Sequence, residues 1–341
     1  MIFSRKMDRH GGRRLPMPKP QSDVICDTCG KVTMTSSIRG YASVLAAAVL
    51  WASSGTASKA LFLSGITPFQ LVQIRVTLAA AALGLMLGLF APRLLKIRAA
   101  DTISFWILGG ALLAMVQFTY LFTISKMPVA TAVLIQYTSP AMVALYSMCF
   151  WGERPTAQKV AALILSLLGC YLVVGGYAMS LLRMNMVGAA TGLASAVFFA
   201  AYSLFGERRM HRYGPWTVSF YAFLFAAVTW NVFETPFHFI WAGYSTTQWG
   251  YILYIAIMGT LLPFGLFFVG VNHIRSTRAS ITSTAEPISA GFMAYVFLGE
   301  TLEPLQLLGG ALVVAAIVLL QIRKERIELA PESVRPRPEA V

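Results

Sequence analysis

Ten apolar runs, each long enough to cross a membrane, fill the chain from about residue 40 onward. A helix of about 20 apolar residues spans a hydrocarbon core of about 30 Å. The runs are apolar on all sides, whereas a membrane β-barrel would alternate apolar and polar residues. The sequence therefore predicts an all-α membrane protein with ten transmembrane helices, at residues 40–62, 68–90, 103–125, 128–150, 156–177, 186–207, 215–235, 249–272, 277–298 and 303–322.

The scarcity of charge excludes a soluble enzyme. Only 12% of the 341 residues are charged and 57% are hydrophobic, whereas soluble domains carry about 25% charged residues. No nucleotide-binding Walker A motif is present, since Gly30-Lys31 is followed by Val32. No HExxH motif is present either, and we predict no cofactor and no catalytic residues.

The distribution of positive charge predicts the orientation in the membrane. Of the 27 Lys and Arg residues, 23 fall on the side that holds the N-terminus, while Lys59, Lys126 and Arg183 fall on the other side and Arg75 lies within a span. Cytoplasmic loops are enriched in Lys and Arg. We expect a multi-pass protein of the cell (inner) membrane with both termini in the cytoplasm. This bias accounts for the net charge of +13 without nucleic acid as a partner.

The two ends of the chain differ from the apolar runs. Residues 1–37 are predicted to be a disordered cytoplasmic tail and residues 324–341 a C-terminal cytoplasmic tail. Cys26 and Cys29 have CxxC spacing, but a closed zinc site needs four ligands and His10 is the only other candidate nearby. We therefore predict no metal site. Translation could start at Met1 or at Met34.

An internal repeat appears when the chain is shifted by 147 residues. Pro68 then falls on Pro215, Pro140 on Pro287, and Gly152-Glu153 on Gly299-Glu300. The repeat predicts two five-helix units, residues 38–177 and 186–323. Because five is odd, the second unit enters the membrane from the opposite face, and such inverted repeats are typical of secondary transporters.

Three motifs resemble the EamA-type transporters of the drug/metabolite transporter superfamily. They are Trp51-Ala52-Ser53-Ser54 with Lys59 in the first span, Pro68 with Arg75 in the second, and Glu286-Pro287 with Gly299-Glu300 around the ninth. The resemblance covers residues 38–323. It implies a ten-helix exporter or permease for small organic solutes such as amino acids, and export as the direction of transport rests on it.

Three ionisable residues within the spans are candidates for substrate binding or coupling. A charge inside a membrane is costly and usually faces the protein interior with a partner. Glu286 could bind a substrate amine or carry a proton in a central cavity, or form a structural ion pair. For Arg75 we favour a structural pair. Lys59 could join this charge network or extend to the outer interface.

Uncharged residues complete the candidate site. Pro140 and Pro287 would kink their spans and act as hinges, or serve only packing. Trp51 and Phe198 occupy matched positions and could form an aromatic wall. The remaining polar residues could line a cavity or bond between helices; they are Gln117, Tyr120, Gln136, Tyr137, Ser139, Tyr202, Asn231 and Asn272.

These features predict a secondary transporter that works by alternating access at a midplane cavity between inverted repeats. The alternative is a membrane-embedded enzyme acting on a lipid or small metabolite, although no acidic or His cluster supports it. A channel would show rings of like polar groups. We expect a small-molecule substrate and the lipid bilayer as partners. The small-residue faces at Gly84/Gly88 and Gly188/Gly192 leave a homodimer open.

Overall fold

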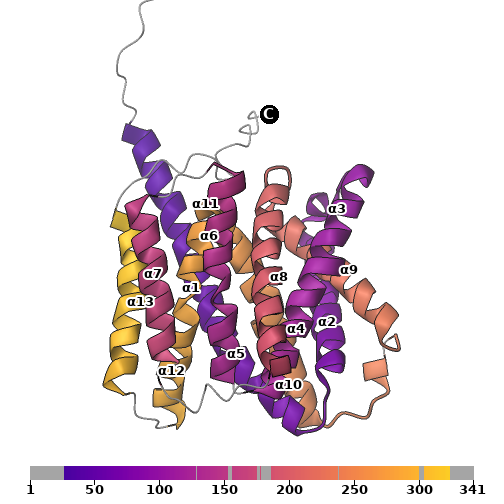
Figure 1. The fold of residues 1–341 in the computed structure, drawn as a ribbon. Coiled ribbons are helices and arrows are strands. Elements are labelled where there is room, and N and C mark those ends of the chain that lie inside the picture. Colours follow the sequence, from indigo (N-terminus) through magenta and orange to yellow (C-terminus); the bar gives the residue numbers. More distant parts are fainter. Residues whose placement is uncertain are drawn as a thin grey trace, which may run out of the picture.

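Helices form all the regular structure of the described chain. The computed structural model describes residues 27–127, 129–152, 156–174, 177, 186–236, 238–298 and 303–322, and no strand occurs among them (Figure 1). The all-α prediction is confirmed for these residues. The principal helices are α1 (Asp27–Leu63), α2 (Pro68–Phe90), α3 (Thr102–Trp106), α4 (Ala114–Lys126), α5 (Val129–Gln136), α6 (Ser139–Phe150), α7 (Ala157–Val173), α8 (Met186–Met210), α9 (Pro215–Phe233), α10 (Thr246–Ala256), α11 (Leu262–Thr282), α12 (Ala285–Leu298) and α13 (Pro304–Ile322).

Most of these helices are apolar enough to lie in a membrane. Within the described residues, seven helical stretches are long and apolar enough to cross it, and two shorter apolar helices accompany them. The long stretches are 37–63, 68–90, 99–126, 131–150, 186–210, 215–233 and 246–282, and the shorter helices are 157–173 and 304–320. The π-helical segments η3 (Ile107–Leu113) and η6 (Ile257–Leu261) interrupt two of the long stretches.

The structure corrects one predicted boundary. Residues 27–37, predicted to be disordered, continue α1 as helix, because extending an existing helix costs far less than starting one. The predicted boundary between the spans 249–272 and 277–298 is marked within α11 by Arg275, whose φ of 69° and ψ of 161° are not helical, so two helical segments meet at this residue. Residues 1–26 and 323–341, including most of both predicted tails, lie outside the described residues, as do Glu153, Arg183 and Gly299-Glu300.

Hydrogen bonds between helix ends define two faces of the molecule. Tyr41 Oη donates to the carbonyl oxygen of Leu320 at 3.2 Å, so α1 begins on the face where α13 ends. We call this the terminal face. Gln248 Nε2 donates to Ser64 Oγ at 3.1 Å, so α10 begins on the opposite face, where α1 ends. We call this the far face.

Glycines allow close approach between α7 and α13, which lie side by side in Figure 1. A Cβ atom at Gly169 would lie 2.7 Å from the carbonyl oxygen of Gly309, and the reverse distance is also 2.7 Å. Without side chains at these positions, the two backbones meet directly, which is how small residues hold membrane helices together. This pair closes one edge of the helical assembly.

Candidate functional site

Two interrupted helical stretches meet near the middle of the molecule. Residues 137–138 separate α5 from α6, and residues 283–284 separate α11 from α12. Pro140 and Pro287 are both buried and stand in the first turn of the helix that follows each break. A proline has no N–H and is compatible with a first turn, so it terminates hydrogen bonding from the preceding helix. Each proline therefore marks a break between two helices.

A cavity lies beside these breaks. The space between its wall atoms amounts to about 540 Å³, including a part that is open to solvent. Counted along the helices, Ser54 and Arg75 are nearer to the far-face ends of α1 and α2, and Tyr120 is nearer to the far-face end of the continuous stretch 99–126. The wall consists of Trp51, Ser54, Arg75, Val116, Gln117, Tyr120, Val133, Gln136, Tyr137, Ser139, Phe199, Phe264, Ser283 and Glu286.

Glu286 supplies the carboxylate of this wall. The side chain is buried, with 9% of the residue exposed, and one oxygen accepts a hydrogen bond from Tyr137 Oη at 2.7 Å. The same hydroxyl lies 2.8 Å from the carbonyl oxygen of Ser283, at the break before α12. Tyr137 therefore connects the two interrupted helices, and Glu286 has no Lys or Arg ion-pair partner among the described residues.

Arg75 supplies the cation and is held by an irregular helix. Its Nε donates to Thr260 Oγ1 and its Nη2 to the carbonyl oxygen of Gly259, both at 2.7 Å. Both acceptors belong to η6, where the wider π-helical turn leaves backbone groups outside the usual ladder. We expected Arg75 to have a fixed structural partner, and the two partners found, Thr260 and Gly259, are neutral. The positive charge of the Arg75 guanidinium is therefore not neutralised by these contacts, and Arg75 lines the cavity.

The aromatic part of the wall carries an unused donor. Trp51 packs against Phe199, Phe264 and Phe267 with ring centroids 5.1–6.0 Å apart. The matched residue Phe198 does not lie on the wall, because Phe199 faces inward instead. Trp51 Nε1 and Gln117 Nε2 are both buried without a hydrogen-bond partner. Buried donors of this kind usually have partners, so the hydrogen-bonding capacity of these two atoms is unused within the described residues.

The remaining predicted residues divide between the cavity wall and other places. Gln136 lies on the wall and accepts a hydrogen bond from Ser195 Oγ at 2.8 Å. Lys59 does not lie on the wall: its Nζ donates to the carbonyl oxygen of Ile124 at 2.7 Å, at the end of α4. Tyr202 is also elsewhere, fully buried and stacked on Phe268. Asn231 bonds to Gln73 and Thr77 between α2 and α9, and Asn272 is buried away from the wall.

A buried ion pair on the terminal-face side was not predicted from the sequence. Glu207, with 1% of the residue exposed, accepts from Arg275 Nε at 3.0 Å and from the backbone N–H of Ser276 at 2.8 Å. Glu207 is the last residue of the predicted span 186–207 and precedes Arg208-Arg209. The only signal was its place in the last turn of an otherwise apolar helix.

The segment after this ion pair is rich in buried hydroxyl groups. Ser280, Thr282, Ser283 and Thr284 are all at most 1% exposed. Each donates to a backbone carbonyl three or four residues earlier, at 2.6–3.1 Å. We call residues 280–284 the hydroxyl segment. It leads from the cavity toward the terminal face.

The sequence profile of the EamA-like transporter family matches this chain twice, over residues 38–175 and 186–322. The chain belongs to this family. Among its relatives is the inner membrane transporter YicL of Salmonella typhimurium, 28% identical over 86% of this chain and 98% of YicL. The threonine/homoserine exporter RhtA of Escherichia coli is 28% identical over 73% of this chain and 83% of RhtA.

A solved structure shares this fold. A crystal structure superposes with a TM-score of 0.65 and 20% identity, covering 84% of this chain and 97% of the other. The EamA-like resemblance seen in the sequence is thus confirmed, and the protein is a multi-pass membrane transporter. Its relatives are named as transporters and not as enzymes.

Proposed function

We propose that this EamA-like protein exports small organic metabolites that carry both an amino and a carboxylate group, such as amino acids. The observation that carries the proposal is the wall of the cavity, where Glu286 and Arg75 face the same space without pairing to each other. A buried charge needs a partner of opposite sign or dipoles that replace water. A zwitterion supplies both charges in one molecule.

The donors on the wall fit the carboxylate of such a substrate. Arg75 uses Nε and Nη2 within the protein, which leaves Nη1 for a further acceptor. Trp51 Nε1 and Gln117 Nε2 add two unused donors. The ammonium group would bind Glu286, with Tyr137 orienting that carboxylate. Tyr120 and Gln136 on the same wall would contact the side chain of the substrate.

Ten transmembrane helices in two inverted five-helix repeats are the architecture we propose for this transport. Supporting it, α1 begins on the terminal face, and α8 begins near the end of α4, where a Cβ atom at Gly188 would lie 3.4 Å from Lys126 Cβ. The breaks at 137–138 and 283–284 also fall close to the 147-residue offset. Interrupted helices at the repeat interface are typical sites of substrate binding in secondary transporters.

Alternating access would use both breaks. The cavity wall lies nearer the far face, whereas Glu207 and Arg275 lie on the terminal-face side, and the hydroxyl segment leads from there to Ser283 on the cavity wall. Pro140 and Pro287 would act as hinges about which α6 and α12 move. The positive charge of the terminal face favours the cytoplasm. The inner-membrane transporter YicL and the exporter RhtA, as relatives, support the inner membrane and export.

Counterflow in liposomes tests the proposal. Liposomes that contain the purified protein are loaded with one unlabelled solute, and uptake of the same solute in labelled form is measured. The assay is repeated for each member of a panel of amino acids and related metabolites, and we expect accumulation of at least one amino acid. Glu286→Gln should lower this uptake about 10–100-fold, because a charge-assisted hydrogen bond contributes roughly 1.5–3 kcal/mol. Glu234→Gln, at the far-face end of α9, should not change it.

Three outcomes would contradict parts of the proposal. Chemical conversion without flux would favour an enzyme over a transporter. Unchanged uptake in Glu286→Gln would remove this carboxylate from the binding site. If the variant transports but keeps the pH dependence of the original protein, Glu286 does not carry a coupled proton.

A further inference from the structure

Basic side chains gather on the terminal face where residues 91–101 meet residues 208–213. These two segments hold six Lys and Arg residues against one carboxylate, that of Asp101. Five of the six are exposed and Arg209 is half-buried. We call the six the basic joint; they are Arg93, Lys96, Arg98, Arg208, Arg209 and Arg212.

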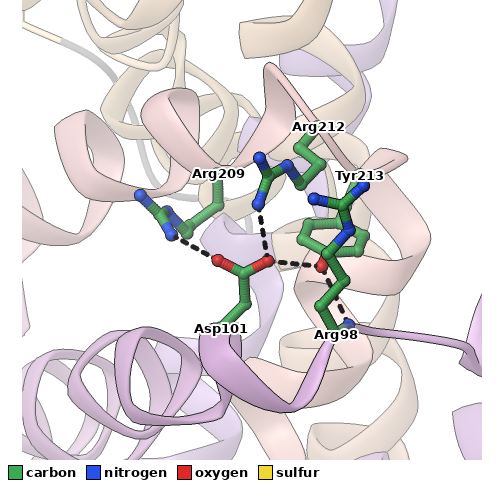
Figure 2. A network of polar contacts seen from close by, with 5 residues as sticks. All are labelled: Arg98, Asp101, Arg209, Arg212 and Tyr213. Carbon is green, nitrogen blue, oxygen red and sulfur yellow. Dashed lines mark hydrogen bonds and ion pairs between the residues drawn. The ribbon is translucent and has the colours of Figure 1, made fainter.

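Asp101 cannot neutralise this joint by itself. One of its oxygens accepts from Arg209 Nη1 at 3.4 Å; the other accepts from Arg212 Nη1 at 3.0 Å and Tyr213 Oη at 2.6 Å. Figure 2 shows Arg209 and Arg212 converging on this carboxylate, with Arg98 beside the Tyr213 ring. Five positive charges remain in excess, and adjacent like charges repel unless an anion lies between them.

The backbone of the joint is fixed. Thr217 Oγ1 donates to the carbonyl oxygen of Leu94 at 2.8 Å, and Tyr221 Oη donates to that of Leu95 at 2.6 Å. Tyr213 Oη also accepts from the backbone N–H of Arg98 at 3.1 Å. The backbone after α2 is thereby held against α9 and the residues before it, so the backbone positions that carry Arg93, Lys96 and Arg98 are fixed.

Exposed apolar side chains lie at the helix ends beside the joint. Leu89 and Phe90 at the end of α2 are 68% and 82% exposed, and Ile103 and Trp106 in α3 are 73% and 49% exposed. Such a surface contacts lipid acyl chains, with tryptophan preferring the interface. Cationic and apolar surfaces therefore adjoin at the depth where a phospholipid places its headgroup and its chains.

The corresponding joint on the far face has no charge. Shifted by 147 residues, Asp101 falls on Gln248, Arg98 on Ser245 and Arg212 on Gly65. There, Gln248 Nε2 donates to Ser64 Oγ at 3.1 Å. This comparison rests on the two-repeat architecture proposed above. On the far face, the two corresponding segments are held together by neutral groups. The packing of these segments therefore does not require the cations of the basic joint on the terminal face.

The geometry points to a binding site for an anionic phospholipid at the basic joint. Its headgroup phosphate would bind between Arg98 and the arginines at the end of α8, and its acyl chains would lie along α2 and α3. Arginine is suited to phosphate through paired N–H donors, and basic pockets on the cytoplasmic side of membrane proteins bind anionic headgroups. The adjoining apolar surface favours a lipid over a soluble phosphate.

Lipid binding to the purified full chain tests this site. Native mass spectrometry would compare phosphatidylglycerol with phosphatidylcholine of the same acyl chains, and we expect at least about tenfold preference for the anionic lipid. Arg98→Gln and Arg208→Gln should each weaken phosphatidylglycerol binding about fivefold, as expected for one charge at a membrane surface. Both variants leave the contacts of Asp101 in place.

Matched variants separate this site from general attraction to the terminal face. Arg98→Lys keeps the charge and should retain most of the binding, whereas Arg39→Gln removes an exposed cation in the N-terminal half of α1 and should change nothing. Equal binding of the two lipids, or an equal loss in Arg39→Gln, would overturn the proposal. Displacement of the lipid by millimolar inorganic phosphate would instead assign the joint to a soluble anion. Since no readout uses transport, failure of the proposed export leaves this test intact.

Discussion

Glu207 joins α8 to α11 through one carboxylate. This carboxylate accepts hydrogen bonds from Arg275 Nε, from the backbone N–H of Ser276 and from the hydroxyl of Ser276. Arg275 also packs over the Trp151 ring at 5.6 Å. The positive φ of Arg275 is rare for a residue with a side chain and costs on the order of 1–3 kcal/mol. The contacts to Glu207 help to hold this conformation.

Replacing this carboxylate should destabilise the protein. We expect Glu207→Gln to lower the free energy of unfolding by roughly 3 kcal/mol, because it removes the negative charge facing a buried arginine. Thermal unfolding in detergent measures the change. Glu303→Gln, an exposed carboxylate that accepts from Tyr177, should shift the midpoint far less. Equal shifts would mean that burial of the Glu207 pair contributes nothing.

At this scale, six of the eight residues named from the sequence as candidates for substrate binding or coupling lie on the cavity wall. Trp51, Arg75, Tyr120, Gln136, Tyr137 and Glu286 lie on the wall. Lys59 and Tyr202 do not, because a rotation of one residue turns a helical side chain by about 100°. Without an amphipathic stripe, a span that is apolar on all sides gives no signal of which face is inward.

Among the helices, the interrupted pair α5–α6 and α11–α12 was the most predictable feature. The prolines and their equal spacing indicated irregular backbone in both halves. The π-helical turns η3 and η6 were not predictable, since Ile107–Leu113 and Ile257–Leu261 are ordinary apolar sequences. Yet η6 supplies both hydrogen-bond acceptors of Arg75. The position of the Arg75 side chain therefore depends on a backbone geometry that the sequence did not predict.

The hinge role of the prolines can be tested by restoring the missing N–H. Pro140→Ala and Pro287→Ala would allow hydrogen bonding across each break, joining the two helices. We expect the turnover of counterflow to fall several-fold while substrate affinity changes little. Pro68→Ala, which alters a first turn at the far face, is the matched control. Turnover equal to that of the unmodified protein would reduce both prolines to a packing role.

For the molecule as a whole, the two faces predict different chemical accessibility. In a protein whose four cysteines are replaced by serine, Gln117→Cys on the cavity wall should react with an impermeant maleimide from the far face. Ser280→Cys should react only from the terminal face and more slowly. Gly243→Cys and Lys96→Cys, in loops of the far and terminal faces, report the orientation of the vesicles.

Two results would contradict this arrangement. If Gly243→Cys reacted from the cytoplasm, the proposed orientation would be reversed. If added substrate failed to change the ratio of labelling between Gln117→Cys and Ser280→Cys, the cavity would not alternate between the two sides. The charge bias of the sequence supports the orientation, but periodicity alone could not assign these opposite halves.

The hydroxyl segment has a consequence for how such a carrier could cycle. Its four side chains each donate to their own backbone, so they leave no donor stranded when a neighbouring helix covers them. The same side chains keep lone pairs that water can bind once that helix withdraws. If this carrier alternates as proposed, such a surface would lose and regain water at little energetic cost, and the closed and hydrated forms of the route would then lie close in free energy.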